Sequence, residues 1–333
     1  MKRVSIASAG GYDRLELRDE PDPVAKPGEV LVRVEAIGVN FADCIVRMGL
    51  YESAKKYVGW PITPGFEVAG ETADGRKVVA VTRFGGYATH VVVPEHQVFA
   101  IPHGWSAAEA AAFPSVYLTA HYALHELCNA RKGTRVLVHS AGGGVGSALV
   151  VLGKLAGCRV VGVVGGAHKV AHVEKLGADV VIDKRAQDLW REAERASPEG
   201  YDIVLDANGV ETLRASYQHL APTGRLVIYG FHTMMSRGRG TPSWPKLAVD
   251  WLRTPRFDPL AMTNDNKSVM AFNLSYLFEH ADLLTASMTT LLGLAEAGKI
   301  APPKVTTFPL DRVKDAHRAL ESGETIGKLV LVP

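Results

Sequence analysis

The chain has 333 residues, 47% of them hydrophobic and 22% charged, which gives enough apolar material for a large core and enough length for two domains. Its 37 basic and 35 acidic residues give a net charge of +2 and form no long single-sign block, which argues against a nucleic-acid-binding protein. The 3 cysteines lie far apart without a C-x-x-C pair, as expected of reduced thiols, and no apolar run reaches the about 18 to 20 residues of a membrane span. We therefore expect a cytoplasmic globular protein with no signal peptide and no membrane-spanning helix.

The first third of the chain shows short apolar segments separated by prolines and glycines. This pattern predicts strands at residues 29–37, 68–72, 77–82 and 88–93. Short strands with frequent turns are typical of a compact β-rich domain.

After Pro114 the pattern changes to strands that alternate with helices. Strands are predicted at residues 135–139, 159–164, 180–183, 203–206 and 226–229, with helices that end near residues 156, 176, 196 and 220. This alternation predicts a doubly wound α/β domain. Further on we expect strands at 272–277, 305–309 and 328–332 and helices at 280–297 and 313–322, with the last strand rejoining the first domain.

A glycine-rich turn joins the first strand of the α/β domain to its helix. It contains Ala141, Gly143, Gly144, Val145 and Gly146, which depart from the dinucleotide-binding pattern G-x-G-x-x-G by one alanine. Such a turn lets backbone N–H groups approach a pyrophosphate, and the helix that follows adds partial positive charge. We predict a dinucleotide site here, and the alternative is a turn that serves close packing alone.

The end of the second strand indicates which dinucleotide binds. NAD-selective folds place an acidic residue there to accept hydrogen bonds from the ribose 2′-OH, but this strand is followed by Gly165 and Gly166. His168, Lys169 and Lys184 lie close behind, and these cations favour the 2′-phosphate of NADPH over NADH. The two lysines fit a solvated helix face and a loop equally well.

The segment from Ser236 to Pro259 has the pattern of a basic amphipathic helix. Its apolar residues have helical spacing and its basic residues outnumber its acidic ones: Trp244, Leu247, Ala248, Trp251 and Leu252, with Arg237, Arg239, Lys246, Arg253 and Arg256 against Asp250 and Asp258. We interpret it as a surface helix that docks one face on its own protein or on a second subunit. A lid or a contact with a lipid surface is the alternative.

Several longer motifs resemble one protein family. They are Gly38-Val39-Asn40-Phe41-Ala42-Asp43, Pro64-Gly65-Phe66-Glu67-Val68-Ala69-Gly70, Gly85-Gly86-Tyr87-Ala88 and Gly327-Lys328. Their order resembles the medium-chain dehydrogenase/reductase superfamily, its zinc-free quinone oxidoreductases and, among these, the branch named for the synaptic vesicle membrane transport protein. The resemblance covers essentially the whole chain. It implies an α/β fold with a GroES-like catalytic domain at residues 1–120 and 260–333, a Rossmann domain at 121–259, and a homodimer.

Two positions separate the chain from the zinc-dependent members of that superfamily. Those members carry Cys near the position of Asn40, and Gly-His-Glu where this chain has Gly65-Phe66-Glu67. Phenylalanine cannot ligate zinc, so we expect no metal site. The resemblance then implies hydride transfer from NADPH to a carbon that is already electrophilic, as in a quinone or an α,β-unsaturated carbonyl.

The resemblance also implies catalytic roles for two residues. Asn40 would lie near the nicotinamide ribose and the substrate carbonyl, unless it only caps a helix that begins at Phe41. Tyr51 would face the pocket as a hydrogen-bond or proton donor, unless it only packs beside Trp60. The family often has a second tyrosine where this chain has Ile45, so solvent is the default source of the proton.

For the cofactor, the resemblance implies contacts from both predicted domains: Asn40, Thr119, Asn208, Tyr229, Gly230, Phe272, Asn273, Leu274 and Lys328. The family's serine after the second strand is Gly166 here, and its tyrosine after the third strand is Lys184. One customary contact with the 2′-phosphate is therefore lost, and a second is replaced by a charge.

We therefore expect a zinc-independent, NADPH-dependent reductase of quinones or enones. An enoyl-thioester reductase of a biosynthetic pathway is the enzymatic alternative, and the pocket motifs do not separate the two. The other alternative is a non-catalytic, cofactor-regulated module whose basic, Trp-containing segment contacts a membrane.

Overall fold

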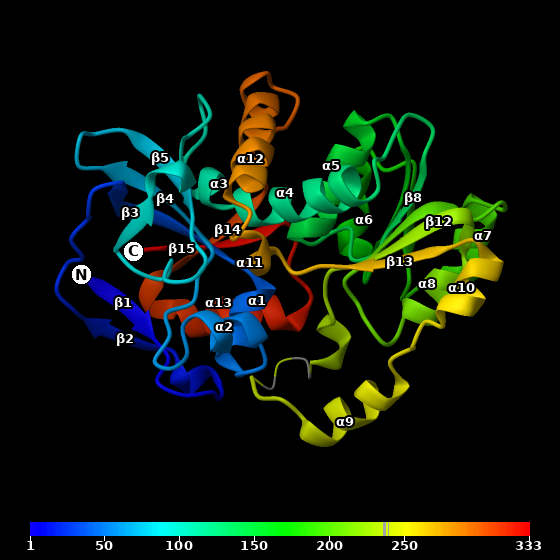
Figure 1. Cartoon of the computed structure of the whole chain (residues 1–333), viewed down its shortest axis with the longest axis horizontal. Helices are drawn as coiled ribbons and strands as arrows, with labels where there is room; N and C mark the ends of the chain where they lie inside the picture. Colours follow the sequence, from blue (N-terminus) through cyan, green and yellow to red (C-terminus); the bar gives the residue numbers. More distant parts are fainter. Residues whose placement is uncertain (236–237, 239) are drawn as a thin grey trace. The chain divides into compact units, whose positions relative to one another are not determined.

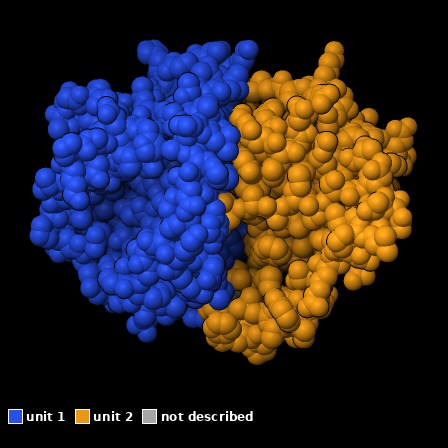
Figure 2. All heavy atoms as spheres, in the orientation of Figure 1, with its two compact units in different colours: residues 1–118, 237–241, 274–333 blue, residues 119–236, 242–273 orange. Residues whose placement is uncertain are grey.

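The computed structural model describes residues 1–235, 238 and 240–333, which form two compact units (Figure 1, Figure 2). Unit 1 comprises residues 1–118, 237–241 and 274–333, and unit 2 comprises residues 119–236 and 242–273. Ser236, Arg237 and Arg239 of the predicted basic segment lie outside the described residues.

Unit 1 is the predicted β-rich unit. Its main sheet has the strand order β14-β15-β3-β4-β5-β7, with β6 paired to β3, and β1 and β2 form a separate pair. The strands are β1 (Lys2–Ser5), β2 (Glu16–Asp19), β3 (Glu29–Val39), β4 (Glu67–Thr72), β5 (Lys77–Val81), β6 (His90–Pro94), β7 (Val98–Ala100), β14 (Val305–Pro309) and β15 (Lys328–Val332). Because β15 pairs antiparallel with β3, the prediction that the C-terminal strand rejoins the first domain is confirmed.

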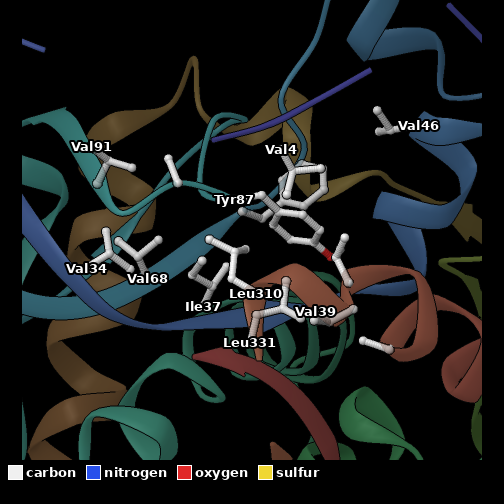
Figure 3. Packing of buried hydrophobic residues seen from close by; sticks show 14 of the residues in the cluster. Val4, Val34, Ile37, Val39, Val46, Val68, Tyr87, Val91, Leu310 and Leu331 are labelled. Atoms are coloured by element: carbon white, nitrogen blue, oxygen red, sulfur yellow. The ribbon is translucent and has the colours of Figure 1, made fainter. Parts of the chain in front are cut away.

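Unit 1 also contains helices, several of which add residues to the core of this sheet. They are η1 (Tyr12–Arg14), α1 (Phe41–Arg47), α2 (Glu52–Tyr57), η2 (Glu95–Gln97), α3 (Ala107–Ala111), α11 (Leu274–Leu277), α12 (Ala281–Glu296), η6 (Leu310–Arg312) and α13 (Val313–Ser322), and α4 (Pro114–His121) continues into the residues of unit 2. Alternating apolar residues of β3, β4 and β15, among them Ile37, Val68 and Leu331, are buried in one cluster (Figure 3). The core therefore joins strands that are far apart in the sequence.

Unit 2 is a Rossmann domain, as predicted. Its six-stranded sheet has the order β10-β9-β8-β11-β12-β13, and every neighbouring pair is parallel. The strands are β8 (Arg135–Val138), β9 (Arg159–Val164), β10 (Val180–Asp183), β11 (Tyr201–Asp206), β12 (Leu220–Ile228) and β13 (Ser268–Ala271). The helices are η3 (Tyr122–Leu127), α5 (Gly144–Leu155), η4 (Ala167–Lys169), α6 (Val170–Lys175), α7 (Leu189–Ala196), α8 (Leu213–Gln218), η5 (His232–Met234), α9 (Trp244–Arg253) and α10 (Pro259–Asp265).

The division of the chain differs from the predicted one near residue 260. Residues 260–273 were expected in the catalytic domain, but β13 pairs in parallel with β12 and so belongs to unit 2. The predicted strand at 272–277 is also wrong, because the strand lies earlier in the chain, at Ser268–Ala271. The pairing ends at Ala271, opposite Ile228, and Leu274–Leu277 forms helix α11 instead. Leu274 and Leu277 are three residues apart, a spacing that fits a helix turn.

Helix α9 confirms that the Trp-containing segment contains a helix, but most of its apolar side chains are exposed to solvent. Trp244, Trp251 and Leu252 are 67%, 62% and 71% exposed. The polar side holds the helix to unit 2, because Lys246 donates to Asp250 and to the carbonyl oxygen of Thr233. Docking of the apolar face on the chain itself is therefore not observed in the described residues.

A buried ion pair connects α1 to α13. Arg47 Nη2 lies 2.7 Å from Glu321 Oε1, and the two side chains are 0% and 2% exposed. Arg47 Nη2 also donates to the carbonyl oxygen of Gly240 at 2.9 Å, which holds this short segment in unit 1. Tyr12 donates to the other oxygen of Glu321 at 2.7 Å. Because water does not reach either side chain, each ionised group is stabilised by the opposite charge of its partner.

Replacing Arg47 by Met should leave the Glu321 carboxylate buried with neutral donors, among them the Tyr12 hydroxyl, and without its cation. We expect the free energy of unfolding to fall by about 3 to 5 kcal/mol, measured by urea denaturation. The matched control is Arg33→Met, which breaks an exposed pair with Glu71 and should cost at most about 1 kcal/mol. Equal small losses in both variants would contradict this account of the buried pair.

Candidate functional site

The predicted cofactor residues of unit 2 gather at one edge of its sheet. Because all six strands are parallel, their carboxyl ends meet at the same edge, where such sheets bind ligands. In strand order, the residues that follow these ends are Ala141, Gly143, Gly144, Val145 and Gly146 after β8, Gly166 and Lys169 after β9, Lys184 after β10, Asn208 after β11, Tyr229 and Gly230 after β12, and Phe272 and Asn273 after β13.

Glycine serves different purposes at two positions of the turn after β8. A Cβ on Gly146 would overlap the carbonyl oxygen of Ser140 and lie 2.7 Å from Ala141 Cα, so Gly146 is needed for helix-to-strand packing. A Cβ on Gly143 would meet only Ser140 O, at 3.4 Å. Gly143 is the N-cap residue of α5, so its backbone leaves open space beside the positive end of that helix.

Asn208 presents a buried amide nitrogen that has no hydrogen-bond partner among the described residues. Its Oδ1 accepts a hydrogen bond from Ser140 Oγ at 3.0 Å, but its Nδ2 is buried and donates to none of them. The residue is 1% exposed. Leaving a buried donor unpaired costs about 1 to 3 kcal/mol, and such groups often bind a ligand. The position therefore fits a cofactor that supplies an acceptor.

Basic side chains surround the end of β9. The aliphatic part of Lys169 covers Gly142, with Lys169 Cδ 3.1 Å from the position of a Cβ there, and Lys169 is 8% exposed, so it is not a solvated face residue. Lys184 N donates to Val164 O at 3.1 Å, which holds Lys184 beside the strand end. Arg185 Nη1 lies 3.4 Å from the position of a Cβ on Gly166.

Sequence reasoning missed Arg185. The signal was present, because Lys184 and Arg185 form a basic pair directly after a predicted strand. Lys184 and Arg185 thus lie near the glycines where NAD-selective folds carry a carboxylate, and Lys169 lies over the neighbouring turn after β8. This electrostatic environment fits a 2′-phosphate.

The remaining cofactor residues lie where the chain passes from one unit to the other. Thr119 is in α4, at the first position of unit 2. Phe272 N donates to Ile228 O at 3.2 Å, and the Phe272 ring packs against Tyr122 with centroids 4.8 Å apart. Leu274 begins α11 in unit 1.

In unit 1, Asn40 belongs to a buried network with Glu67 and Lys328. Asn40 Nδ2 donates to Glu67 Oε1 at 2.9 Å, and Lys328 Nζ lies 2.6 Å from the same oxygen. Lys328 also donates to Asn40 Oδ1. The second carboxylate oxygen accepts the backbone N–H of Ser115 at 2.6 Å. Both ends of the Asn40 amide are therefore bound, which fixes the direction of its remaining N–H.

Glu67 is a residue of this network that the sequence analysis did not select. It is 0% exposed at the start of β4, and Lys328 is 4% exposed. A Cβ on Gly38 would overlap the Glu67 carboxylate, so the glycine in β3 lets the acidic side chain approach. A carboxylate directly before the apolar segment Val68-Ala69-Gly70 was the available signal.

Asp43 holds the backbone of Asn40 in place through a hydrogen bond. Its carboxylate accepts the N–H of Asn40 and the N–H of Gly65, each at 2.8 Å, and the hydroxyl of Tyr87 at 3.1 Å. Burial raises the pKa of Asp43 to about 7 in spite of these bonds. Asn40 stands at the N-cap position of α1, as the alternative proposed, but its amide is occupied by Glu67 and Lys328.

Tyr51 lies in a trio of aromatic rings with Phe66 and Phe84. Its ring centroid is 5.9 Å from that of Phe66 and 6.4 Å from that of Phe84, and both contacts are edge-to-face. Phe66 and Phe84 are 5.2 Å apart. Tyr51 thus packs against other rings, as the alternative expected, but these rings are those of Phe66 and Phe84, where the alternative named Trp60. Of the three rings, Phe66 is the one at the position where zinc-dependent relatives carry histidine.

Another cluster has the composition of a metal site but already contains a cation. Ligand atoms of Cys44, His317 and Glu321 lie within 4.8 Å of one another, the one such group in the described part of the chain. Arg47 Nη1 donates to His317 Nδ1 at 2.9 Å, and Arg47 Nη2 binds Glu321. Burial keeps the pKa of His317 well below its usual value, so the ring is neutral and can accept this bond.

Two family descriptions match the two parts of the chain. Residues 26–103 match the Alcohol dehydrogenase GroES-like domain, and residues 176–331 match the family described as Zinc-binding dehydrogenase. The synaptic vesicle membrane protein VAT-1 homolog of Danio rerio is 35% identical over 341 residues, covering 99% of this chain and 69% of that protein.

Two solved structures are similar over the full chain. The human synaptic vesicle membrane protein VAT-1 homolog-like protein is 31% identical with a TM-score of 0.84, covering 100% of this chain and 98% of that chain. The quinone oxidoreductase from Thermus thermophilus, solved also as its complex with NADPH, is 32% identical with a TM-score of 0.82 and covers 100% of both chains.

A GroES-like unit, a Rossmann unit and these matches define a medium-chain dehydrogenase/reductase. Within that superfamily, the chain belongs to the quinone oxidoreductase-like family that includes the VAT-1 homologs, which confirms the resemblance stated from its motifs. None of its helices, as far as the structure describes them, is long and apolar enough to cross a membrane.

Gly143→Glu should separate cofactor binding from folding. A Cβ at this glycine would make only an ordinary contact, with Ser140 O, so the variant should keep its melting temperature, while its carboxylate would repel a pyrophosphate at the helix end. We expect at least about a hundredfold loss of NADPH affinity by isothermal titration. The control is Gly293→Glu, at an exposed position of α12 with no atom within 4 Å, which should bind normally. Undiminished NADPH binding by a folded Gly143→Glu protein would refute this site.

Proposed function

We propose that the protein is an NADPH-dependent reductase that transfers hydride to quinones or α,β-unsaturated carbonyls without a metal ion. The observation that carries the proposal is the buried network of Glu67, Lys328 and Asn40. A cation and an amide donor are bound to Glu67, the residue after Phe66, and zinc-dependent relatives carry a metal ligand at the position of Phe66. A cation and a hydrogen-bond donor are what a developing enolate or quinol oxygen requires.

Unit 2 supplies the cofactor site in this proposal. The open face of Gly143 and the N-terminus of α5 would hold the pyrophosphate, and Asn208 Nδ2 would donate to the cofactor. Lys169, Lys184 and Arg185 would hold the 2′-phosphate. When bound, NADPH supplies the hydride, which the substrate alkene or quinone accepts conjugatively.

Unit 1 supplies the donors for the substrate oxygen. An ammonium group donates three hydrogen bonds, and Lys328 directs two of them to Glu67 and Asn40. Its third N–H and the second N–H of Asn40 would stabilise negative charge as the carbonyl oxygen gains an electron pair. Glu67 and Asp43 position these donors through bonds to Asn40 and Lys328.

The aromatic trio suits a planar, apolar acceptor. The rings of Tyr51, Phe66 and Phe84 would pack against a quinone or enone and exclude water from the reacting carbon. With Ile45 in place of a second tyrosine, the proton that completes the reduction would come from solvent. The homodimer and the cytoplasmic location remain predictions, and the three cysteines, all buried and free, are consistent with a reducing compartment.

Removing one cation at the end of β9 should change cofactor preference. Lys184→Gln and Arg185→Gln should each weaken NADPH binding about tenfold or more, because each would lose a charge-assisted bond worth about 1.5 to 3 kcal/mol. NADH has no 2′-phosphate, so its affinity should stay unchanged. Titration of both cofactors checks this, with Lys175→Gln on the exposed end of α6 as the control. A parallel loss for both cofactors would mean that these residues serve the fold instead.

Reduction itself is tested by NADPH oxidation with benzoquinone and a short enone in the presence of a chelator. The wild-type protein should turn over both, and Lys328→Met should lower kcat about a hundredfold, the usual effect of losing a donor to an oxyanion. Lys299→Met, at an exposed residue of the same unit, should be unaffected.

The double variant Glu67→Gln/Lys328→Met controls for folding. It removes the unpaired buried charge that Lys328→Met alone would leave, so its stability should recover while kcat stays low. Full activity in the double variant, or chelator-sensitive turnover in the wild type, would contradict the proposal.

A further inference from the structure

A second group of charged and aromatic side chains lies beside the aromatic trio in unit 1. We call it the Tyr57 cluster, and its members are Lys56, Tyr57, Arg83, Tyr276, Phe278 and Glu279. The Arg83 guanidinium lies 4.1 Å from the centroid of the Tyr57 ring and 5.5 Å from that of Phe278. Lys56 Nζ lies 4.9 Å from the Tyr57 centroid. Two cations thus share one aromatic ring.

The charges of the Tyr57 cluster do not balance. Its one carboxylate, Glu279, accepts the hydroxyl of Tyr57, and the cations Lys56 and Arg83 both lie near it. The pKa of Glu279 is lowered, first by the Tyr57 hydrogen bond and further by these cations and by His280. Next to the cluster, Lys55 pairs with Glu52 at 3.1 Å and adds no net charge. The group therefore keeps an excess of one positive charge.

The Tyr57 cluster is connected to the aromatic trio at two points. Arg83 directly precedes Phe84, whose ring contacts Tyr51. Helix α2 begins immediately after Tyr51 and ends at Tyr57. Its position is fixed by a buried hydrogen bond, 2.7 Å long, between Ser53 Oγ and Ser275 Oγ. The cations are therefore held at a set position relative to the rings that would pack against the substrate.

We propose that the Tyr57 cluster binds a carboxylate on the substrate, so that the preferred substrates are enones or quinones carrying a negative charge away from the reacting carbon. This inference rests on the proposed reductase function. A single excess positive charge matches a monoanion, and the planar guanidinium of Arg83, which is partly exposed, can bind a carboxylate with two parallel hydrogen bonds. The aromatic neighbours reduce hydration of the cations, which strengthens such a bond.

The chemistry of the reduction is unchanged by the carboxylate. The alkene carbon gains hydride from NADPH, which becomes NADP⁺, and the neighbouring carbon gains a proton from solvent. The carboxylate takes no part in bond making. Its contribution is affinity and orientation of the alkene relative to the aromatic trio.

The test compares an oxo-alkenoic acid containing a conjugated enone with its methyl ester. The two compounds have the same reacting group and differ in the charge of the remote end. We expect the wild-type protein to show a KM for the acid about tenfold or more below that for the ester, the effect of one charge-assisted hydrogen bond. Added salt should narrow the difference.

Variants assign the effect to the cluster. Arg83→Gln should raise the KM for the acid about tenfold and leave the ester unchanged, and Arg83→Lys should recover part of the difference. Arg76→Gln, an exposed arginine on the turn between β4 and β5, is the matched control and should behave as wild type. Equal KM values for acid and ester in the wild type, or equal changes for both in Arg83→Gln, would overturn the inference while leaving the reductase intact.

A binding measurement separates this inference from the reductase proposal. If neither compound is reduced, the reductase proposal fails, and titration of the acid into the protein still decides the inference. Tighter binding of the acid by the wild type than by Arg83→Gln would support the carboxylate site. Equal binding by the two proteins would overturn it.

Discussion

The buried carboxylate of Glu67 is the group on which the arrangement of unit 1 around Asn40 depends. A charge with no access to water must be neutralised, and here it is neutralised by Lys328 from the last strand and by donors from Asn40 and Ser115. The same bonds that stabilise the carboxylate join β3, β4, β15 and the start of α4. Lys328 thus has two roles in this account: it neutralises Glu67, and it is the cation proposed to stabilise charge on the substrate.

Unit 2 is organised by a different constraint, the parallel direction of its strands. That direction brings six loops to one edge of the sheet, and each contributes a short segment with little bulk or with a polar group. At this edge Asn208 Nδ2 is buried without a partner in the described residues, whereas Asp206, Ser140 and Thr233 around it form hydrogen bonds. One buried donor left without a partner in the described residues fits the phosphate-containing cofactor that we propose for this edge of the sheet.

Local patterns in the sequence were sufficient for most of the fold. The alternating strands and helices of unit 2, its glycine turn and the β-rich character of unit 1 follow from periodicity and turn residues, and the structure confirms them. Periodicity could not place residues 272–277, because a short segment in which apolar and polar residues alternate also contains helical spacings. Pairing with β12 decides where the strand ends. Nor could it show that the apolar face of α9 is exposed, since a helical pattern does not say what covers it.

The site was only partly accessible to sequence reasoning. Asn40 and Lys328 were selected through the family resemblance, but their bond joins residues 288 positions apart, and no local pattern contains it. Glu67 was not selected because the sequence does not show that its carboxylate is buried, and the burial is what requires a cation and donors around it. The proposed reductase function gives no role to the exposed Trp residues of α9, whose pattern was also interpreted as a contact with a membrane or a second subunit.

The central claim is direct hydride transfer from NADPH to an electrophilic carbon without a metal. The most direct measurement uses NADPH deuterated at the transferring position, an enone acceptor and protein freed of metals by a chelator, with the product analysed by mass spectrometry and NMR. The account predicts that the chelated protein keeps its turnover and that deuterium appears on the β-carbon of the saturated product. Product without deuterium, or turnover that is lost on chelation and restored by zinc, would contradict it.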